Sequence, residues 1–211
     1  MLSAVPTKFG DLTRDHRALM SDVPSRIARA CRGVTVPGPM DPRSDAMRKE
    51  LLATLRHIAS PSLDEQTMCE IDQDMIPHII AAAEESGCDY DEEEIRGIVA
   101  DLVPAIMRVK YRFNMPRPWQ VAPAYGLSLL RLQSDSAETP SYPSGHAIQA
   151  AVACGVLSAR NPFAARALDQ AAEEIGESRL ALGLHFPIDV LVGLRVGRQI
   201  ADNIATPRLA P

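Results

Sequence analysis

Apolar residues recur three or four positions apart from Ser44 to about residue 204, and no long stretch alternates apolar with polar residues. A recurrence of three to four places side chains on one face of an α-helix, whereas strict alternation indicates a β-strand. The apolar lines of the first three expected helices are Met47, Leu51, Leu55 and Ile58; Met68, Ile71, Met75 and Ile79; and Ile95, Ile98, Leu102, Ile106 and Val109. The pattern therefore predicts an all-α protein.

Capping residues and prolines indicate where the expected helices begin and end. Ser62, followed three positions later by Glu65, has the spacing of a capping box and opens the second helix. The third helix opens near Asp91 and contains Pro104, which should kink it. Three more helices are expected over residues 145–159, from the Asn161 cap and Pro162 to about residue 182, and over residues 186–204. The expected fold is a single-domain bundle of about six helices.

The first 42 residues differ from the rest because they contain several prolines and scattered arginines. We expect an irregular N-terminal arm over residues 1–42, with one short helix near residues 22–32, and a helical catalytic domain over residues 43–211. Acidic residues dilute the positive charge of the arm, so a basic recognition arm is the less favoured alternative. A homo-oligomer in which the arm crosses to a neighbouring copy is a second alternative.

Composition narrows the class of protein. The chain has 211 residues and a net charge of −5 at pH 7, which argues against general nucleic-acid binding. Its four cysteines are far apart, which disfavours a disulfide framework or a zinc site. The acidic run at residues 88–94 lies at a helix start, where carboxylates oppose the helix dipole favourably, so we expect no metal there. Neither an export signal nor a bilayer-spanning apolar run is visible, and we expect a cytoplasmic protein with no transmembrane segment.

Three polar clusters interrupt the helical pattern. They are KYRFNMPRP at residues 110–118, PSGH at residues 143–146 and SRLALGLHFPID at residues 178–189. Taken singly, each has a structural explanation: surface cations, a helix cap, and an ion pair near a helix start. Taken together, they supply the groups of an anion-binding catalytic site.

The PSGH cluster stands at an expected helix start. Ser144 is a favoured N-cap, because its hydroxyl accepts from an early backbone N–H. The backbone N–H groups of Ser144 and Gly145 and the positive end of the helix dipole also form a ready anion site. His146, in the first turn, would face that anion.

The last cluster pairs a histidine with a carboxylate. His185 and Asp189 are four positions apart, which on a helix places them on one face. A carboxylate that accepts from one ring nitrogen fixes the imidazole tautomer and leaves the other nitrogen free to attack. Arg179 would share the same pocket if the chain turns at Gly183.

The charges of the clusters suit phosphoryl transfer. Lys110, Arg117 and Arg179 are cations that match a group with several oxygens and two negative charges, and arginine binds such oxygens in bidentate fashion. Two histidines then supply a nucleophile and a general acid. Metal-free phosphoryl transfer needs little more than this positioning and electrostatic stabilisation.

The order Lys-x6-Arg-Pro, Pro-Ser-Gly-His and Ser-Arg-x5-His-x3-Asp is complete in the chain over residues 110–189. In this order the clusters resemble those of the type 2 phosphatidic acid phosphatase and vanadium haloperoxidase superfamily, and the expected protein is a soluble member of it. The resemblance implies the helical core of that superfamily.

The resemblance also implies a role for each site residue. His185 would be the nucleophile that forms a phosphohistidine, Asp189 would orient it, and His146 would protonate the leaving oxygen and later activate water. The phosphate would be held by Lys110, Arg117, Ser144, Gly145 and Arg179.

The expected function is a metal-independent, acid-phosphatase-like phosphoric monoester hydrolase that acts on a small phosphorylated substrate and uses no cofactor. The alternative is a vanadium-dependent haloperoxidase, in which the same pocket holds vanadate with His185 as its ligand. A non-catalytic phosphate-binding protein is a third hypothesis. It would be expected to have lost a histidine or arginine of the motifs, and none is lost.

Overall fold

The computed structural model describes residues 4–21 and 24–205, and over these ranges it contains helices and no strand. The predicted all-α fold is confirmed. The longer helices are α3 (Asp45–Ala59), α4 (Glu65–Gln73), α5 (Ile76–Glu85), α6 (Glu92–Phe113), α8 (Gly145–Arg160), α9 (Ala165–Ala181) and α10 (Pro187–Ala205). The shorter ones are α1 (Arg14–Ala18), α2 (Arg26–Ala30), α7 (Pro118–Val121) and the 3-10 helices η1 (Ala122–Tyr125), η2 (Asp135–Glu138) and η3 (Pro162–Ala164). None of the helices in the described ranges has the length and apolar character needed to cross a bilayer.

The second expected helix is in fact two helices, α4 and α5. Asp64, and not Ser62, caps α4, because its carboxylate accepts from the backbone N–H of Thr67 at 2.9 Å. The chain then turns at Asp74, whose carboxylate accepts from the backbone N–H of Ile76 at 3.0 Å where α5 begins. This break, together with the one-turn helices, gives the bundle more helices than the expected six.

Two other helix starts also differ from expectation. The helix expected from Asn161 begins as η3, and the Asn161 side chain donates to the carbonyl oxygen of Leu157 instead of capping the next helix. The last helix begins at Pro187, so His185 lies just before α10 and not on it. The predicted start at Asp91 is confirmed, since its carboxylate caps α6.

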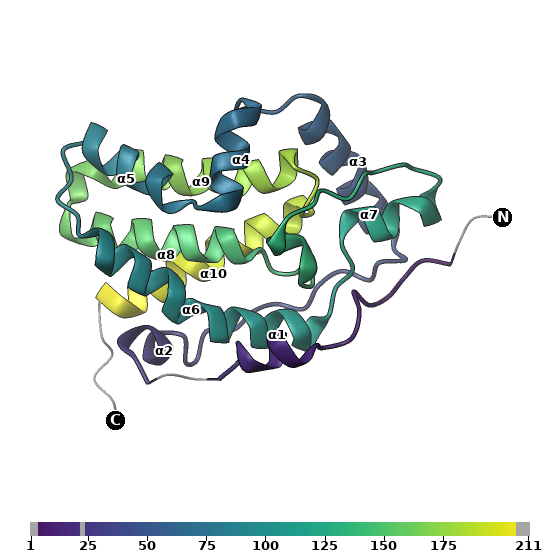
Figure 1. Ribbon diagram of the computed structural model, residues 1–211, viewed down its shortest axis with the longest axis horizontal. Coiled ribbons are helices and arrows are strands. Elements are labelled where there is room, and N and C mark those ends of the chain that lie inside the picture. The colour runs from purple at the N-terminus through teal and green to yellow at the C-terminus, as the bar shows by residue number, and fades with distance from the viewer. Residues whose placement is uncertain (1–3, 22–23, 206–211) are drawn as a thin grey trace.

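Helix α8 lies at the centre of the bundle and packs against α6, α9 and α10 (Figure 1). Four of its ten buried residues are alanine and one is glycine, and these small residues let neighbouring helices approach closely. A Cβ added at Gly197 of α10 would lie 2.6 Å from the Cβ of Ala151 and 2.6 Å from the carbonyl oxygen of Ile148. Glycine at position 197 is therefore required for the close contact that sets α10 against α8.

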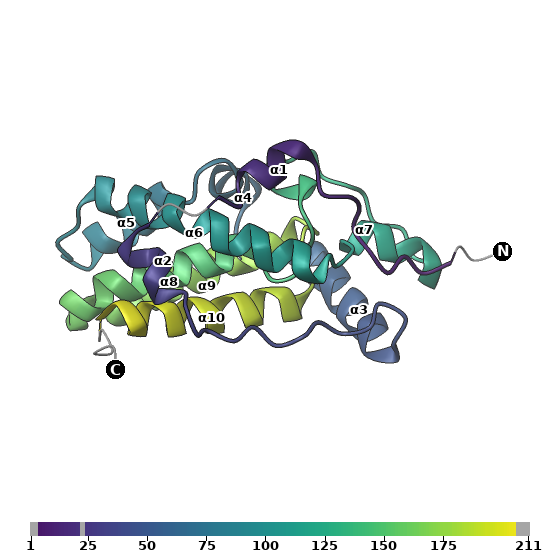
Figure 2. The ribbon, with the colours of Figure 1, turned by 90° about the horizontal axis from the view of Figure 1, so that it is seen from below.

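The described part of the N-terminal segment follows the surface of the bundle (Figure 2). The backbone N–H of Phe9 donates to the carbonyl oxygen of Asn114 at 2.8 Å, and the Tyr142 hydroxyl donates to the carbonyl oxygen of Pro37 at 2.8 Å. Its short helix α2 falls within the predicted range, and Ile27 in that helix is buried against the core. The segment thus packs on its own chain, beside the elements that carry the polar clusters.

Candidate active site

The three polar clusters meet around one small cavity beside the N-terminus of α8. The cavity has a volume of about 130 Å³, roughly the space of four water molecules, and it suits a single tetrahedral oxyanion. Lys110 comes from the last turn of α6, Arg117 caps α7, and His185 precedes α10. Together with Gly145 and His146 of α8, these side chains line the cavity. Segments that are distant in sequence therefore form one site.

The turn that carries His185 to this site is the one expected at Gly183. Helix α9 ends at Ala181, and Gly183 has a φ of +68°, a conformation that glycine adopts without strain. The backbone N–H of Leu184 donates to the carbonyl oxygen of Arg179 at 3.0 Å. Arg179 and His185 are thereby held at the same end of the bundle.

Asp189 holds His185 in place. Its Oδ2 accepts from Nδ1 of His185 at 3.2 Å, from the backbone N–H of Phe186 at 3.0 Å, and from the Ser141 hydroxyl. Burial raises the pKa of the Asp189 carboxyl to about 6, although these hydrogen bonds and the nearby cations oppose the rise. The carboxylate is thus positioned by several donors at once.

The proton of His185 is located by its two neighbours. Nη1 of Arg117 lies 2.9 Å from Nε2 of His185, and a guanidinium can only donate, so Nε2 must carry its lone pair. The proton then resides on Nδ1 and is donated to Asp189. Burial and the adjacent cations, first among them Arg117, hold the pKa of His185 well below its usual value. The result is a neutral imidazole whose Nε2 carries the lone pair.

Arg117 and Lys110 are buried cations that donate to backbone carbonyls. Arg117 is fully buried, and it donates to the carbonyl oxygens of Leu184 at 2.6 Å, Thr139 at 2.8 Å and Ser136. Nζ of Lys110 donates to the carbonyl oxygen of Pro140 at 2.6 Å. Burial lowers the pKa of Arg117 to about 9 and holds the pKa of Lys110 well below its usual value. Both positive groups are therefore held in place before any substrate binds.

Arg179 is fully buried, and part of its guanidinium has no partner. Nη2 donates to the carboxylate of Asp72 at 2.5 Å and to the Ser136 hydroxyl at 2.7 Å. Nε and Nη1 have no hydrogen-bond partner among the residues that the structure describes. Because a buried donor without a partner is costly, these two groups indicate a place for an anion.

The donors at the start of α8 differ from expectation in one respect. The backbone N–H of Ser144 donates to the backbone carbonyl oxygen of Asp189 at 3.0 Å, and its hydroxyl accepts from the N–H of Ala147. Ser144 thus ties α8 to α10 and caps α8, and its own N–H is not free for an anion. Gly145 lines the cavity, where a Cβ would lie 3.3 Å from Ile106 and 3.6 Å from Cε of Lys110.

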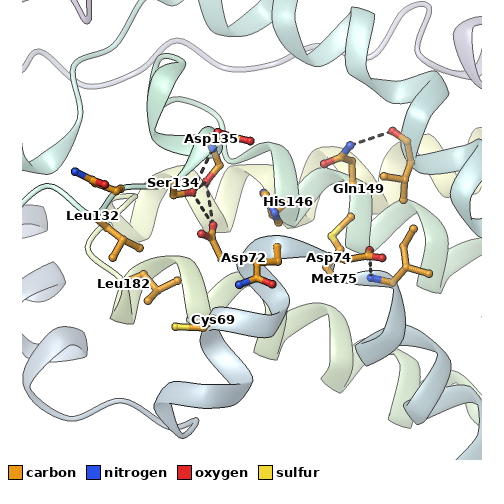
Figure 3. A pocket seen from close by; sticks show the side chains of 15 residues that line it. Cys69, Asp72, Asp74, Met75, Leu132, Ser134, Asp135, His146, Gln149 and Leu182 are labelled. Carbon is orange, nitrogen blue, oxygen red and sulfur yellow. Dashed lines mark hydrogen bonds between the residues drawn. The ribbon is translucent and has the colours of Figure 1, made fainter.

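His146 stands between the small cavity and a larger one. The larger cavity has a volume of about 650 Å³ and shares His146, Gln149 and Ser136 with the small one. Figure 3 shows His146 between Asp72 and Gln149 in this larger space. Burial, and then Arg179, Lys110 and Arg117, hold the pKa of His146 well below its usual value, so the imidazole is neutral.

A comparison with models of protein families identifies the superfamily of this chain. The model of the PAP2 superfamily matches residues 97–201, which hold all three clusters. The chain belongs to the PAP2 superfamily. This is the superfamily that the order of the clusters predicts. None of the curated proteins matches the chain.

Two solved structures share the PAP2 fold of this chain. The first bacterial vanadium-dependent iodoperoxidase superposes with a TM-score of 0.61 at 19% identity, over 86% of this chain and 54% of its own. This PAP2 chain thus spans about half the length of that peroxidase. A transmembrane PAP2-type phosphatidylglycerolphosphate phosphatase from Bacillus subtilis superposes with a TM-score of 0.53 at 16% identity, over 84% of this chain and 90% of its own. At these identities the likeness shows a common fold.

Several residues of the site were not singled out from the sequence of this PAP2 chain. Asp72 of α4 and Ser136 of η2 hold Arg179, and Ser141 donates to Asp189. Gln149 lines both cavities one turn after His146 in α8. No motif marks these positions, although the spacing of Gln149 from His146 places them on one helix face. Among the described residues, no group of three or more histidine, cysteine or acidic side chains is arranged to hold a metal ion.

Proposed function

We propose that this chain is a metal-independent phosphatase that cleaves phosphomonoesters through a phosphohistidine. The observation that carries the proposal is the position of His146 in the wall common to the two cavities. A group that protonates a leaving oxygen must lie between the phosphoryl group and the alcohol, and His146 lies at that boundary. The small cavity would hold the phosphate and the larger one the alcohol.

In the first step, Nε2 of His185 attacks phosphorus and the bond from phosphorus to the ester oxygen breaks. The incoming phosphate oxygen replaces Nε2 as the acceptor for Nη1 of Arg117, which frees the nucleophile. His146 gives its proton to the leaving oxygen, so that a neutral alcohol departs. Asp189 stabilises the positive charge that His185 gains, because Nδ1 donates to its carboxylate.

In the second step, His146 removes a proton from water, and the water oxygen attacks phosphorus. The bond from phosphorus to Nε2 breaks, inorganic phosphate is released, and His185 returns to its neutral form. The phosphoryl oxygens would be held throughout by Lys110, Arg117, Arg179 and the backbone N–H of Gly145. Ser144 would contribute by fixing the start of α8, since its own N–H is engaged.

Vanadate has the shape and charge pattern of phosphate, and the same donors fit it. Its oxygens would be held by Lys110, Arg117 and Arg179, and His185 would be its ligand. Bound in this way, vanadate would supply the activation of peroxide. Peroxide and a halide ion are small and need no cavity of about 650 Å³ beside His146. The alcohol of a phosphate ester does need an open space beside His146, and this favours the phosphatase.

The nucleophile is tested by His185→Ala, with His57→Ala in α3 as the matched control. Phosphatase activity should fall to background in His185→Ala and stay at the wild-type level in His57→Ala. Rapid quenching of the wild type in alkali should trap an acid-labile phosphoryl group that His185→Ala lacks. Turnover retained by a folded His185→Ala protein would contradict the assignment.

Orthovanadate separates the two activities of the superfamily in one paired assay. With a phosphatase, orthovanadate should inhibit hydrolysis of para-nitrophenyl phosphate and should confer no halide oxidation with peroxide. With a haloperoxidase, halide oxidation should appear on addition of orthovanadate. Halide oxidation without phosphate ester hydrolysis would overturn the proposed function.

A further inference from the structure

The larger cavity has walls of a definite chemistry, and this chemistry bears on the alcohol half of the substrate. Fifteen residues line it, and among the parts of the chain that the structure describes they include three aspartates and no lysine or arginine. An inference about the alcohol rests on the proposed function, in which this cavity holds the leaving group. An anionic alcohol would be repelled by a net negative charge in these walls, and a long acyl chain would cover that charge without pairing it.

Two of the three aspartates are already compensated. Asp72 pairs with Arg179 at 2.5 Å, and Asp74 pairs with Arg96 at 3.1 Å. Asp135 has no basic partner among the described residues. Arg131, from the same loop, pairs with Glu138 instead. Asp135 therefore contributes the uncompensated negative charge of the cavity.

Polar acceptors surround this charge on the path from His146. The Ser134 and Ser136 hydroxyls, which flank Asp135 in the chain, both donate to Oδ1 of Asp72. Across the cavity, the amide nitrogen of Gln149 donates to the carbonyl oxygen of Val99 at 3.0 Å. Figure 3 shows its amide oxygen turned toward His146. A leaving group that carries hydrogen-bond donors would thus find acceptors on both sides.

We propose that the larger cavity selects a small alcohol that carries an ammonium group, and that Asp135 is the residue that recognises it. The preferred substrate is then the phosphate monoester of a short amino alcohol. Its phosphate end would be bound by the cations of the small cavity and its ammonium end by Asp135. The charge of the protein is therefore opposite at the two ends of the site, as it is in such a substrate.

The test uses three esters of nearly the same size that end in different groups: phosphoethanolamine, ethylene glycol phosphate and propyl phosphate. The three alcohols differ in acidity, so the wild-type values of kcat/KM are not compared directly. The readout is how a substitution changes the ratio of kcat/KM for phosphoethanolamine to kcat/KM for propyl phosphate. Asp135→Asn should lower kcat/KM for phosphoethanolamine about three- to fivefold relative to propyl phosphate, the upper end for a partly exposed ion pair. Asp101→Asn removes a carboxylate of α6 that lies outside this cavity and should leave the ratio unchanged.

Each outcome decides the question. If Asp135→Asn leaves this ratio unchanged, or if Asp101→Asn changes it equally, the inference is overturned and the proposed function stays intact. An equal loss for ethylene glycol phosphate overturns the selection of an ammonium group. If para-nitrophenyl phosphate is cleaved and none of the three esters is, the inference fails alone. If no phosphate ester is cleaved, the proposed function fails and the inference with it.

Discussion

At the scale of single residues, the site is governed by the burial of ionisable groups close to one another. His146 and His185 are kept neutral because burial and three neighbouring cations disfavour their charged forms. A general acid, however, must carry a proton when the leaving oxygen departs. A bound phosphate dianion would offset the cations and restore that proton, so substrate binding and protonation of His146 are expected to be coupled.

We therefore predict that phosphate binding takes up a proton. The pKa of His146 is depressed in the free protein and should rise when a dianion binds, so near pH 8 the imidazole gains a proton on binding. Titration calorimetry with inorganic phosphate, in buffers of different ionisation enthalpy, measures this uptake. It should be lost in His146→Gln, and equal uptake in the variant and the wild type would contradict the prediction.

His146→Ala should lower kcat by about 10²- to 10⁴-fold for alkyl phosphates, as is typical when a general acid is removed. The loss should be smaller for para-nitrophenyl phosphate, because its leaving group departs without a proton. Steady-state kinetics with esters of graded leaving-group acidity measures the trend. A loss that does not depend on the leaving group would rule out the acid role.

At the scale of helices, the site depends on how closely α8 and α10 approach. Ser144, at the start of α8, donates to the backbone of Asp189 near the start of α10, so these two helices fix the geometry of His146 relative to His185. Gly193 and Gly197 make room for that approach. A Cβ at Gly193 would lie 2.8 Å from the carbonyl oxygen of Ser144 itself.

Gly197→Ala is expected to destabilise the protein by about 1–3 kcal/mol, because its new methyl group meets backbone and a Cβ that cannot move aside freely. Gly97→Ala in α6 is the matched control, since a Cβ there meets nothing within 4 Å. Gly97 is exposed in the interior of a helix, so its replacement by alanine should stabilise the protein by about 0.5–1 kcal/mol. Urea denaturation compares the two, and equal effects would show that the α8–α10 contact tolerates a side chain.

At the scale of the whole molecule, the proposed anion site forms only when distant segments are assembled. Arg179 and its partner Asp72 are separated by 107 positions, and Arg117 and His185 by 68. An unfolded chain therefore has no comparable anion site. Ligand binding to the native state alone must stabilise the fold by mass action.

Inorganic phosphate should raise the thermal midpoint of the wild type in a concentration-dependent manner. At a concentration one hundred times the Kd, the stabilisation is about 2.7 kcal/mol. Lys110→Met removes a cation of the small cavity and should shift this response to higher phosphate concentrations. Arg198→Met removes a cation that pairs with Asp169 and Glu173 on the surface and should not. Equal responses of the two variants would count against the small cavity as the phosphate site.

The sequence by itself determined the fold class and the superfamily. Apolar spacing and capping depend on residues within one or two turns, so the all-α fold, the start of α6 at Asp91 and the turn at Gly183 could be predicted locally. The three motifs also predicted that His146, His185 and Asp189 lie together, and the structure has both histidines lining one cavity with Asp189 bonded to His185. The break between α4 and α5 was missed, because the apolar line from Met68 to Ile79 continues across Asp74.

Only the tertiary structure decided what surrounds the motif residues. It assigned the backbone N–H of Ser144 to Asp189, brought Asp72 and Ser136 to Arg179, and set His146 in the wall between two cavities. It also left Asp135 as the uncompensated charge of the larger cavity. These features depend on contacts between segments distant in sequence, and on which charges remain without a partner after packing. No local sequence pattern encodes these long-range contacts or these unpaired charges.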